Sequence, residues 1–205
     1  VTNQALRTRG TGYVNLGDTE ALRITNAITM SAWIKLADAT GDQPILVKEG
    51  SGKCSYWFGV YNYRFGLLIG TGAGWGVWAR SSGSVTTGVW THVASTWDGT
   101  NWCNYLNGER VASGVYSGEM LTSTAPVQIG QNSEWASTHL NGLIDELRIW
   151  NRALTTNELA GLAAVRAWPS APRRGGASST ASTPIWSVTS SAHAITNDAA
   201  SRSPR

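Results

Sequence analysis

Hydrophobic and polar residues follow one another in short segments along most of this chain, and this pattern predicts β-strands. Segments rich in β-branched and aromatic residues recur every 8 to 14 positions, separated by Gly, Asn or Asp. Such spacing is typical of a sandwich or barrel, and twelve short strands make two stacked sheets. The expected strands lie near residues 4–8, 12–16, 27–36, 45–49, 55–61, 64–70, 74–80, 89–97, 101–107, 110–113, 126–130 and 143–151.

Two dipeptides predict tight hairpins in the middle of the chain. Asp98-Gly99 separates two apolar segments, and Asn107-Gly108 follows the second of them. Both dipeptides readily supply the positive φ angles that a two-residue hairpin turn needs. The three segments around these turns are therefore expected to form an antiparallel meander.

One segment, Thr155–Val165, has the spacing of a helix. Thr155 or Thr156 serves as the N-cap, and Glu158 falls near the third helical position, where its side chain completes a capping box. The apolar residues that follow lie on one face. This short helix is expected to cover a sheet edge or one end of the sandwich.

The composition changes at Trp168, after which Pro, Ser, Thr, Ala and Arg dominate. We therefore divide the chain into a domain of residues 1–165 and an irregular tail or linker of residues 166–205. Within that tail only Ile185–Val188 is apolar, so Pro184–Val188 is expected to add a short strand or to fill a groove.

The charge distribution excludes one class of partner. Only 14% of the 205 residues are charged, against about 25% in ordinary globular proteins. Residues 166–205 hold five Arg and one Asp, whereas residues 1–165 hold eleven Lys or Arg against twelve Asp or Glu. A body so nearly neutral offers little to neutralise phosphates, so we expect no nucleic-acid partner.

Membrane insertion is not expected either. The longest apolar stretches are a few residues long, far short of the ~20 that span a bilayer. No charged-then-apolar signal peptide precedes Val1, so the sequence reads as a soluble protein in a mature or trimmed form.

The aromatic residues of segment 55–61 are candidates for ligand binding. If Tyr56, Phe58 and Val60 face the core, alternation makes Trp57 and Tyr61 point outward on either side of Gly59. Exposed aromatic rings bind the apolar C–H faces of sugars, and the missing side chain of Gly59 leaves room for a sugar ring. Further residues could extend this surface: Tyr63, Arg64, Trp75 and Trp78. The alternative is that these rings cover core or a dimer surface.

The two cysteines are expected to remain thiols, with a disulfide as the alternative. They match no metal-binding spacing and are too few for a disulfide framework. Strand alternation places Cys54 on the core side and Cys103 on the outer side, an arrangement that disfavours a bridge.

Three stretches carry a family resemblance: Ala27–Leu36, Gly88–Gly99 followed by Tyr105–Gly108, and Leu140–Leu154. Together they resemble the laminin-G-like, concanavalin-A-like jelly-roll family, which includes the pentraxins. The resemblance covers about residues 4–160 and implies a two-sheet antiparallel jelly roll. It further implies a carbohydrate-binding or adhesive module, frequently with calcium, that belongs to a larger secreted or cell-surface protein. Four tryptophans of the pattern are expected to be structural: Trp33, Trp90, Trp97 and Trp150.

The same fold also carries glycosidases, whose acidic cluster alternates along one strand. That cluster is missing from this sequence. Asp145 and Glu146 are adjacent, so a regular strand places them on opposite faces. In that strand Leu143, Asp145, Leu147 and Ile149 are expected to share one face. Sugar-degrading glycosidase or lyase activity is therefore the less favoured reading.

The resemblance to pentraxins implies a calcium site between two loops. Asp42-Gln43 precedes an apolar strand in the position of a pentraxin ligand pair, and Asn132 and Glu134 fall where pentraxins carry an acidic loop. Their oxygens suit Ca²⁺, although two carboxylates predict modest affinity. Asp145 with backbone oxygens near the N-terminal strand is a competing site. The remaining alternative is that these are ordinary loop and sheet residues.

The sequence thus predicts an all-β jelly roll that binds a glycan or polysaccharide without turning it over. A protein-adhesion or assembly domain is the leading alternative.

Overall fold

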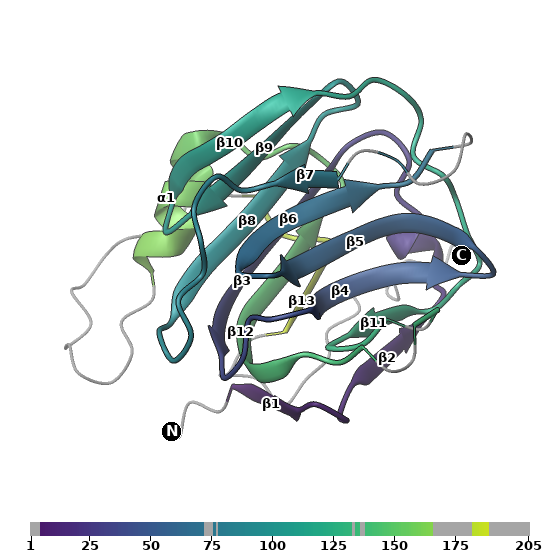
Figure 1. The fold of residues 1–205 in the computed structure, drawn as a ribbon. Coiled ribbons are helices and arrows are strands. Elements are labelled where there is room, and N and C mark those ends of the chain that lie inside the picture. The colour runs from purple at the N-terminus through teal and green to yellow at the C-terminus, as the bar shows by residue number, and fades with distance from the viewer. Residues whose placement is uncertain are drawn as a thin grey trace, which may run out of the picture.

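The computed structural model describes residues 5–71, 76, 78–132, 134–135, 138–165 and 182–188. They form a sandwich of two antiparallel sheets with one α-helix (Figure 1). The strands are β1 (Leu6–Arg9), β2 (Val14–Gly17), β3 (Ile28–Leu36), β4 (Asp42–Gly50), β5 (Lys53–Tyr61), β6 (Arg64–Ile69), β7 (Trp78–Arg80), β8 (Thr91–Trp97), β9 (Asn101–Leu106), β10 (Glu109–Val115), β11 (Val127–Ile129), β12 (Asn141–Trp150) and β13 (Trp186–Val188). A 3-10 turn, Glu20–Leu22, follows β2. A strand is present at each of the twelve predicted positions, although residues 4, 74, 75 and 77 of the predicted segments lie outside the described residues. The expected jelly-roll sandwich is confirmed.

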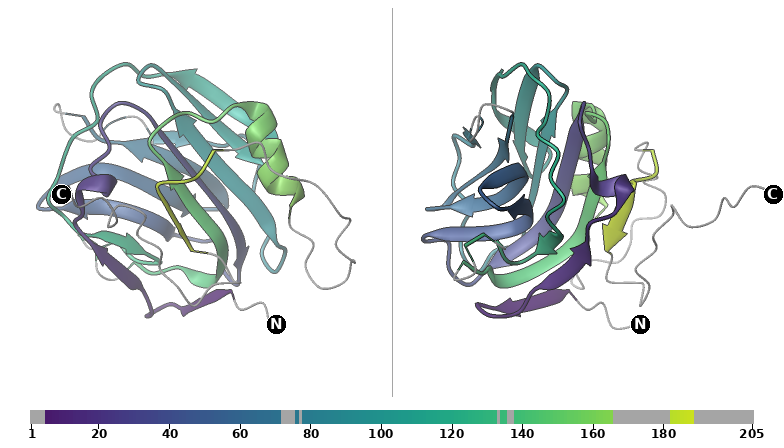
Figure 2. Two further views of the ribbon diagram at one scale, coloured as in Figure 1. Left: turned by 180° about the vertical axis from the view of Figure 1, so that it is seen from behind. Right: turned by 90° about the vertical axis from the view of Figure 1, so that its right-hand side faces the viewer.

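The two sheets have different sizes. The seven-stranded sheet runs β1-β12-β3-β8-β9-β10, with β13 paired to β12, and the six-stranded sheet runs β2-β11-β4-β5-β6-β7. Consecutive strands β8, β9 and β10 form the predicted meander, with Gly99 and Asn107-Gly108 at positive φ in its turns. Figure 2 shows the two layers edge-on, with α1 (Thr156–Ala164) on the outer side of the seven-stranded sheet.

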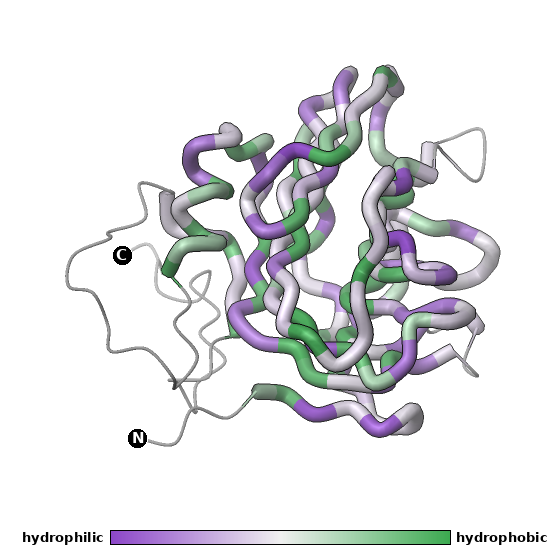
Figure 3. Tube along the Cα trace, turned by 60° about the vertical axis from the view of Figure 1, so that its left-hand side comes forward, coloured by the Kyte–Doolittle hydropathy of each residue, from purple (hydrophilic) through white to green (hydrophobic). Residues whose placement is uncertain are grey.

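The main core lies between the sheets. Tyr56, Phe58 and Val60 of β5 all belong to it and are fully buried, as alternation predicts. Figure 3 shows apolar and polar positions interspersed along the strands that enclose it. Among the pattern tryptophans, Trp97 lies in this core and Trp150 is buried under α1. Trp33 is half-buried and meets His92 edge to face at 5.5 Å, and Trp90 is also half-buried.

Two β-bulges overturn predictions that assumed strict alternation. In β12 the register with β3 shifts between Asp145 and Arg148, and Glu146 takes a φ of 51°. Leu147 and Ile149 therefore face the core with Ile144, whereas Leu143 and Asp145 do not join it. The expected shared face of Leu143, Asp145, Leu147 and Ile149 is wrong because the extra residue reverses the alternation.

The second bulge lies in β5 and concerns the cysteines. Glu49 pairs with Cys54 and Lys48 pairs with Tyr56, so Ser55 is the extra residue. Cys54 consequently packs on the outer face of the six-stranded sheet, and its predicted place on the core side is wrong. Cys103 packs on the outer face of the other sheet, next to α1. Both cysteines are free, because the whole sandwich separates them.

Helix α1 begins as predicted. The Thr155 hydroxyl accepts a hydrogen bond from the Glu158 N–H, and the Glu158 carboxylate accepts from the Thr155 N–H at 2.9 Å. This capping box satisfies two backbone donors that a helix start leaves unpaired. Leu159 and Leu162 pack against Tyr105 and Trp150, so the helix covers the outer face of the seven-stranded sheet.

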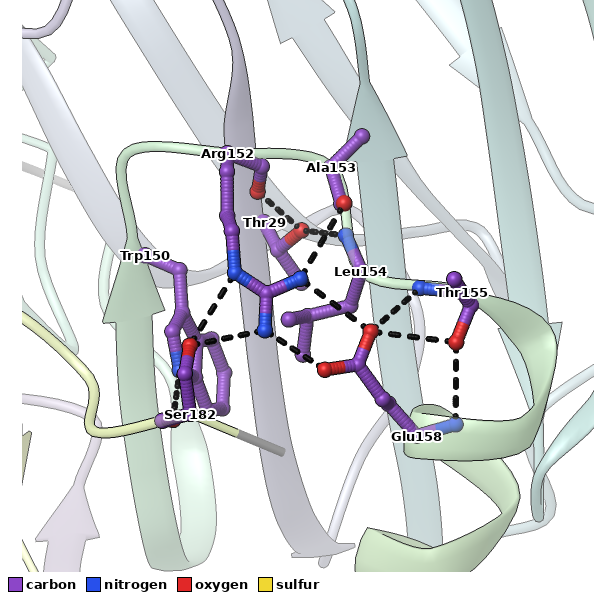
Figure 4. Close-up of polar contacts among 8 residues, drawn as sticks. All are labelled: Thr29, Trp150, Arg152, Ala153, Leu154, Thr155, Glu158 and Ser182. Carbon is purple, nitrogen blue, oxygen red and sulfur yellow. Dashed lines mark hydrogen bonds and ion pairs between the residues drawn. The ribbon is translucent and has the colours of Figure 1, made fainter. Parts of the chain in front are cut away.

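The C-terminal segment 182–188 is part of the sandwich. Strand β13 pairs with β12, and Trp186 is 3% exposed within the main core, which confirms the expected strand. The Trp150 indole donates to the Ser182 carbonyl at 2.8 Å, and Arg152 contacts both the Ser182 hydroxyl and Glu158 (Figure 4). One arginine therefore ties this segment to the helix cap.

No α-helix among the residues that the structure describes is long and apolar enough to cross a membrane.

Candidate functional site

The outer face of the six-stranded sheet carries a cluster of aromatic side chains. Trp57 and Trp78 have ring centroids 5.0 Å apart, and the Tyr61 ring meets Trp78 edge to face at 5.3 Å. These three rings and Arg80 are called the aromatic face below. They meet because Trp57 pairs with Leu68, which pairs with Trp78, and side chains in register across a sheet stand side by side. The predicted grouping of Trp57, Tyr61 and Trp78 is therefore present.

The role expected of Trp57 does not match its burial. Its side chain points to the outer face as predicted, but Trp57 is only 3% exposed and packs against Val47, Cys54 and Leu68. The space above Gly59, expected to receive a sugar ring, is occupied by this indole, because a Cβ at Gly59 would lie 2.7 Å from Trp57 Cζ2. Trp57 thus lies beneath the aromatic face, and Tyr61 and Trp78 are its more exposed rings.

Arg80 completes the aromatic face and is absent from the sequence-based list. Its guanidinium lies 4.7 Å from the centroid of the Trp78 ring and 5.4 Å from that of Tyr61. Stacking of this kind fixes both the ring orientation and the position of five N–H donors. Trp78 and Arg80 are two positions apart on β7, so they lie on the same face of the sheet. This spacing could have identified Arg80 as a neighbour of Trp78 from the sequence.

The hairpin between β5 and β6 borders the aromatic face. Asn62 and Tyr63 both take positive φ angles there, and Tyr63 is 44% exposed at the tip. The Arg64 guanidinium donates to the carbonyl oxygens of Ser81 and Ser82, so it anchors the loop after β7. Tyr63 and Arg64 thus lie at the rim as expected, whereas Trp75 lies outside the described residues.

An exposed tryptophan, Trp135, lies near Glu49 on the same sheet. Trp135 is 56% exposed, and a hydrogen bond links it to the buried side chain of Glu49 on β4. Asn132 Nδ2 also donates to Glu49, at 2.8 Å. Sequence reasoning considered this loop only for metal binding and missed Trp135, because nothing in its local pattern distinguishes an exposed loop tryptophan from a buried one.

The four residues expected to bind calcium differ in whether their oxygen atoms already have hydrogen-bond partners. Gln43 is 6% exposed and both ends of its amide are engaged: Nε2 donates to the Thr40 carbonyl, and Oε1 accepts from the Asn141 N–H. Its side chain therefore does not fit a metal ligand. Asp42 differs, because its Oδ1 is buried without a hydrogen-bond partner. Burial and the negative charge of Glu49 raise the pKa of Asp42 to about 7.

Asn132 and Glu134 lie together beyond β11. The Glu134 N–H donates to Asn132 Oδ1 at 3.0 Å, and Glu134 Oε1 accepts from the Gly52 N–H at 3.1 Å. The negative charge of Glu134 contributes to a raised pKa of Glu49, whose largest cause is burial. Another buried oxygen, Oε1 of Gln128, also has no partner. A cation near Glu49 would relieve the repulsion that raises the pKa of Asp42 and of Glu49.

Within the described part of the chain, no three His, Cys, Asp or Glu side chains come together as a metal-binding group. Asp145, the competing candidate, belongs to the other sheet, and its Oδ1 accepts from the Glu146 N–H at the β-bulge. It serves there as a structural acceptor.

Glu146 and Asp145 are not arranged like paired catalytic carboxylates. Glu146 forms an ion pair with Arg148, and Asp145 is 4% exposed. The rule of opposite faces does not apply to these neighbours, because Glu146 sits in the bulge at positive φ.

Comparison with known proteins agrees with this architecture. Domain 4 of AbnA, a GH43 extracellular arabinanase from Geobacillus stearothermophilus solved with arabinotriose, superposes with a TM-score of 0.64 and 26% identity, covering 78% of this chain and 76% of that one. The sialyllactose-bound CBM40 of the Ruminococcus gnavus IT-sialidase superposes with a TM-score of 0.62 and 13% identity, covering 78% of this chain and 96% of that one.

Among curated sequences, the rat protein named for its sushi, von Willebrand factor type A, EGF and pentraxin domains is 25% identical over 186 residues. That match covers 77% of this chain but 5% of the rat protein. A model of the concanavalin A-like lectin/glucanases superfamily matches residues 8–160. The chain therefore belongs to the concanavalin A-like lectin/glucanases superfamily.

Proposed function

We propose that this domain is a non-catalytic, lectin-like module that binds a neutral glycan on the outer face of its six-stranded sheet. The observation that carries the proposal is the pair of half-exposed rings, Tyr61 and Trp78, set on the buried floor of Trp57. Flat rings that remain accessible on a rigid sheet suit the C–H faces of pyranose or furanose rings.

Arg80 adds hydrogen-bond donors to this surface, and Trp135 extends it toward β4. Arg80 holds donors beside the two accessible rings, where sugar hydroxyls accept hydrogen bonds. Trp135 stands over Glu49 of β4, which belongs to the same face. A site that extends from β7 toward β4 accommodates several sugar units, so an oligosaccharide is a better ligand than a monosaccharide.

Arabinotriose is the first probe to use. The G. stearothermophilus domain solved with that trisaccharide is 26% identical to this chain over most of both lengths. A glycan array that contains arabino-oligosaccharides, followed by an assay for new reducing ends, tests the proposal. Binding without turnover supports it. Release of reducing or unsaturated ends contradicts it and favours an enzyme.

The alternative is an adhesion or assembly domain, in which the rings contact protein. The curated rat relative, built of several named domains, motivates this alternative. It predicts no glycan binding together with an oligomer whose population rises with concentration, which analytical ultracentrifugation measures.

Calcium is a separate proposal within the same face. Asp42 and Glu134 would hold the ion, and Gln128 would offer another oxygen. The Asn132 amide is engaged at both ends, like that of Gln43, and would position Glu134 through the hydrogen bond that its Oδ1 accepts. Bound Ca²⁺ supplies positive charge, which relieves the repulsion around Glu49. With so few carboxylates the expected affinity is that of weak extracellular sites, with dissociation constants of about 0.1–1 mM.

The calcium proposal has a direct test. Thermal unfolding of protein stripped with EDTA is followed as CaCl₂ is added. A rise in Tm that Asp42→Asn abolishes and Asp145→Asn preserves supports the site. No rise in the original protein contradicts it, and loss only in Asp145→Asn moves the site to the other sheet.

We also propose that the domain works outside the cell as one part of a longer protein. The chain spans 5% of the rat relative, and the bacterial domain belongs to an extracellular enzyme. Detection of the full-length product in washed cell surface and culture supernatant fractions tests this location.

A further inference from the structure

The seven-stranded sheet has a pocket of its own, far from the aromatic face. Its volume is about 270 Å³, and residues of β1, β12 and β3, which are neighbours in the sheet, line it. Leu36, Ala37, Gly88, Gly142 and Leu143 contribute to its lining. Three cationic residues also line it: Arg7, Arg9 and Lys35.

Strand register explains why the cations converge. Arg7 pairs with Leu143, and Leu143 pairs with Lys35, so the two cations flank one leucine in adjacent strands. Arg9 follows Arg7 by two positions on β1 and therefore shares its face. The intervening Thr8 is 2% exposed and donates from its hydroxyl to the Gly142 carbonyl, which fixes the strand.

Among the residues that the structure describes, these charges have no acidic ion-pair partner. Four ion pairs link described residues, and none of them involves Arg7, Arg9 or Lys35. The acids nearest in sequence or register have hydrogen-bond partners of their own. Asp38 accepts hydrogen bonds from the Thr40 N–H and hydroxyl, and the buried Asp145 accepts from the Glu146 N–H.

An excess of positive charge around a small pocket favours one type of ligand. The lining combines apolar surface with cationic side chains, and arginine binds carboxylate and sulfate groups in a forked geometry. A sugar ring with an acidic substituent offers both features, because its C–H face is apolar and its acid group is anionic.

We infer that the pocket formed by Arg7, Arg9 and Lys35 is a second saccharide site, specific for sugars that carry a carboxylate or sulfate group. It is independent of the aromatic face, which lies on the opposite sheet. The domain thereby holds two sites with different ligand chemistry, one for neutral and one for acidic sugars.

The test uses isothermal titration with three probes: trigalacturonate for the carboxylate, a sulfated heparin disaccharide for the sulfate, and arabinotriose as the neutral sugar. Arg9→Gln and Lys35→Gln are the variants. Arg110→Gln, an exposed cation on β10, is the matched control for net charge. We expect affinity for at least one acidic probe to fall about tenfold or more in both pocket variants and to stay unchanged in the control.

The outcomes separate this site from the proposed neutral-glycan site. If Trp78→Ala weakens arabinotriose binding and leaves acidic binding intact, the two sites are distinct. Failure of the protein to bind either acidic probe overturns the inference even if arabinotriose binds. So does an equal loss of affinity in Arg110→Gln, which indicates general attraction to a cationic surface. The probe whose binding depends on Arg9 identifies the acid group.

Discussion

The indole of Trp57 fills the space that the missing side chain of Gly59 leaves on the neighbouring part of β5. A Cβ at Gly59 would lie 2.7 Å from Trp57 Cζ2 and 2.6 Å from the Gln43 carbonyl oxygen. Because Gly59 has no side chain, the Trp57 ring can pack directly over its backbone. Trp78 packs on the Trp57 ring, with the two ring centroids 5.0 Å apart. This pair of residues determines that the accessible rings of the face are Tyr61 and Trp78.

Gly59→Ala forces the Trp57 ring or the strand to shift, so the free energy of unfolding should fall by about 1–3 kcal/mol. Urea denaturation measures it. Gly12→Ala is the control, since a Cβ at Gly12 has no atom within 4 Å. Equal midpoints for both variants would show that Trp57 does not rest on Gly59.

Trp57→Ala is expected to damage stability rather than binding alone. The side chain is 3% exposed, and removing a buried aromatic side chain costs about 3–5 kcal/mol because the cavity collapses only in part. The urea midpoint should drop steeply. An unchanged midpoint with lost glycan affinity would instead assign Trp57 to direct ligand contact.

Acid unfolding is predicted to depend on Glu158. The Arg152 guanidinium, and then the Thr155 N–H and hydroxyl, lower the pKa of Glu158 to about 2 from its ordinary 4.5 (Figure 4). Because the folded pKa is the lower one, the unfolded state binds more protons, and this stabilisation is lost as the pH falls from 4.5 toward 2.

Urea midpoints recorded across that pH range measure the effect. Glu158→Gln should be less stable than the original protein at neutral pH, and the difference should shrink in acid. Asp18, whose pKa is lowered by Arg23 and Lys48, adds its own slope to both proteins and cancels in the comparison. A difference that stays constant with pH would exclude the Arg152–Glu158 pair as its source.

The cysteines should react as two thiols of unequal reactivity. Burial, aided by the charge of Glu49, raises the pKa of Cys54 well above its ordinary value, whereas Cys103 is half-buried. In the native protein without reductant, iodoacetamide is expected to label Cys103 first and Cys54 only after urea is added. Mass spectrometry of the peptides reads this out. A Cys54–Cys103 linked peptide would contradict the observed strand order.

The sequence pattern predicted the strands, the meander turns and the capping box because each depends on neighbouring residues. It was wrong at Cys54 and at the shared face of Leu143 and Leu147 because a single extra residue in a strand reverses alternation. Neither Ser55 nor Glu146 differs from an ordinary strand residue in the sequence alone. The burial of Trp57 and the exposure of Trp135 depend on contacts across strands, which no local pattern contains.

The most direct test of a glycan site on the six-stranded sheet is the dissociation constant for arabinotriose, measured by isothermal titration for the original protein, Trp78→Ala and Tyr13→Ala. Trp78 belongs to the aromatic face, whereas Tyr13 is 49% exposed next to β2, at the opposite edge of that sheet. We predict that Trp78→Ala weakens binding about tenfold or more while Tyr13→Ala leaves it unchanged. Equal affinity in all three proteins would contradict a binding site at the aromatic face.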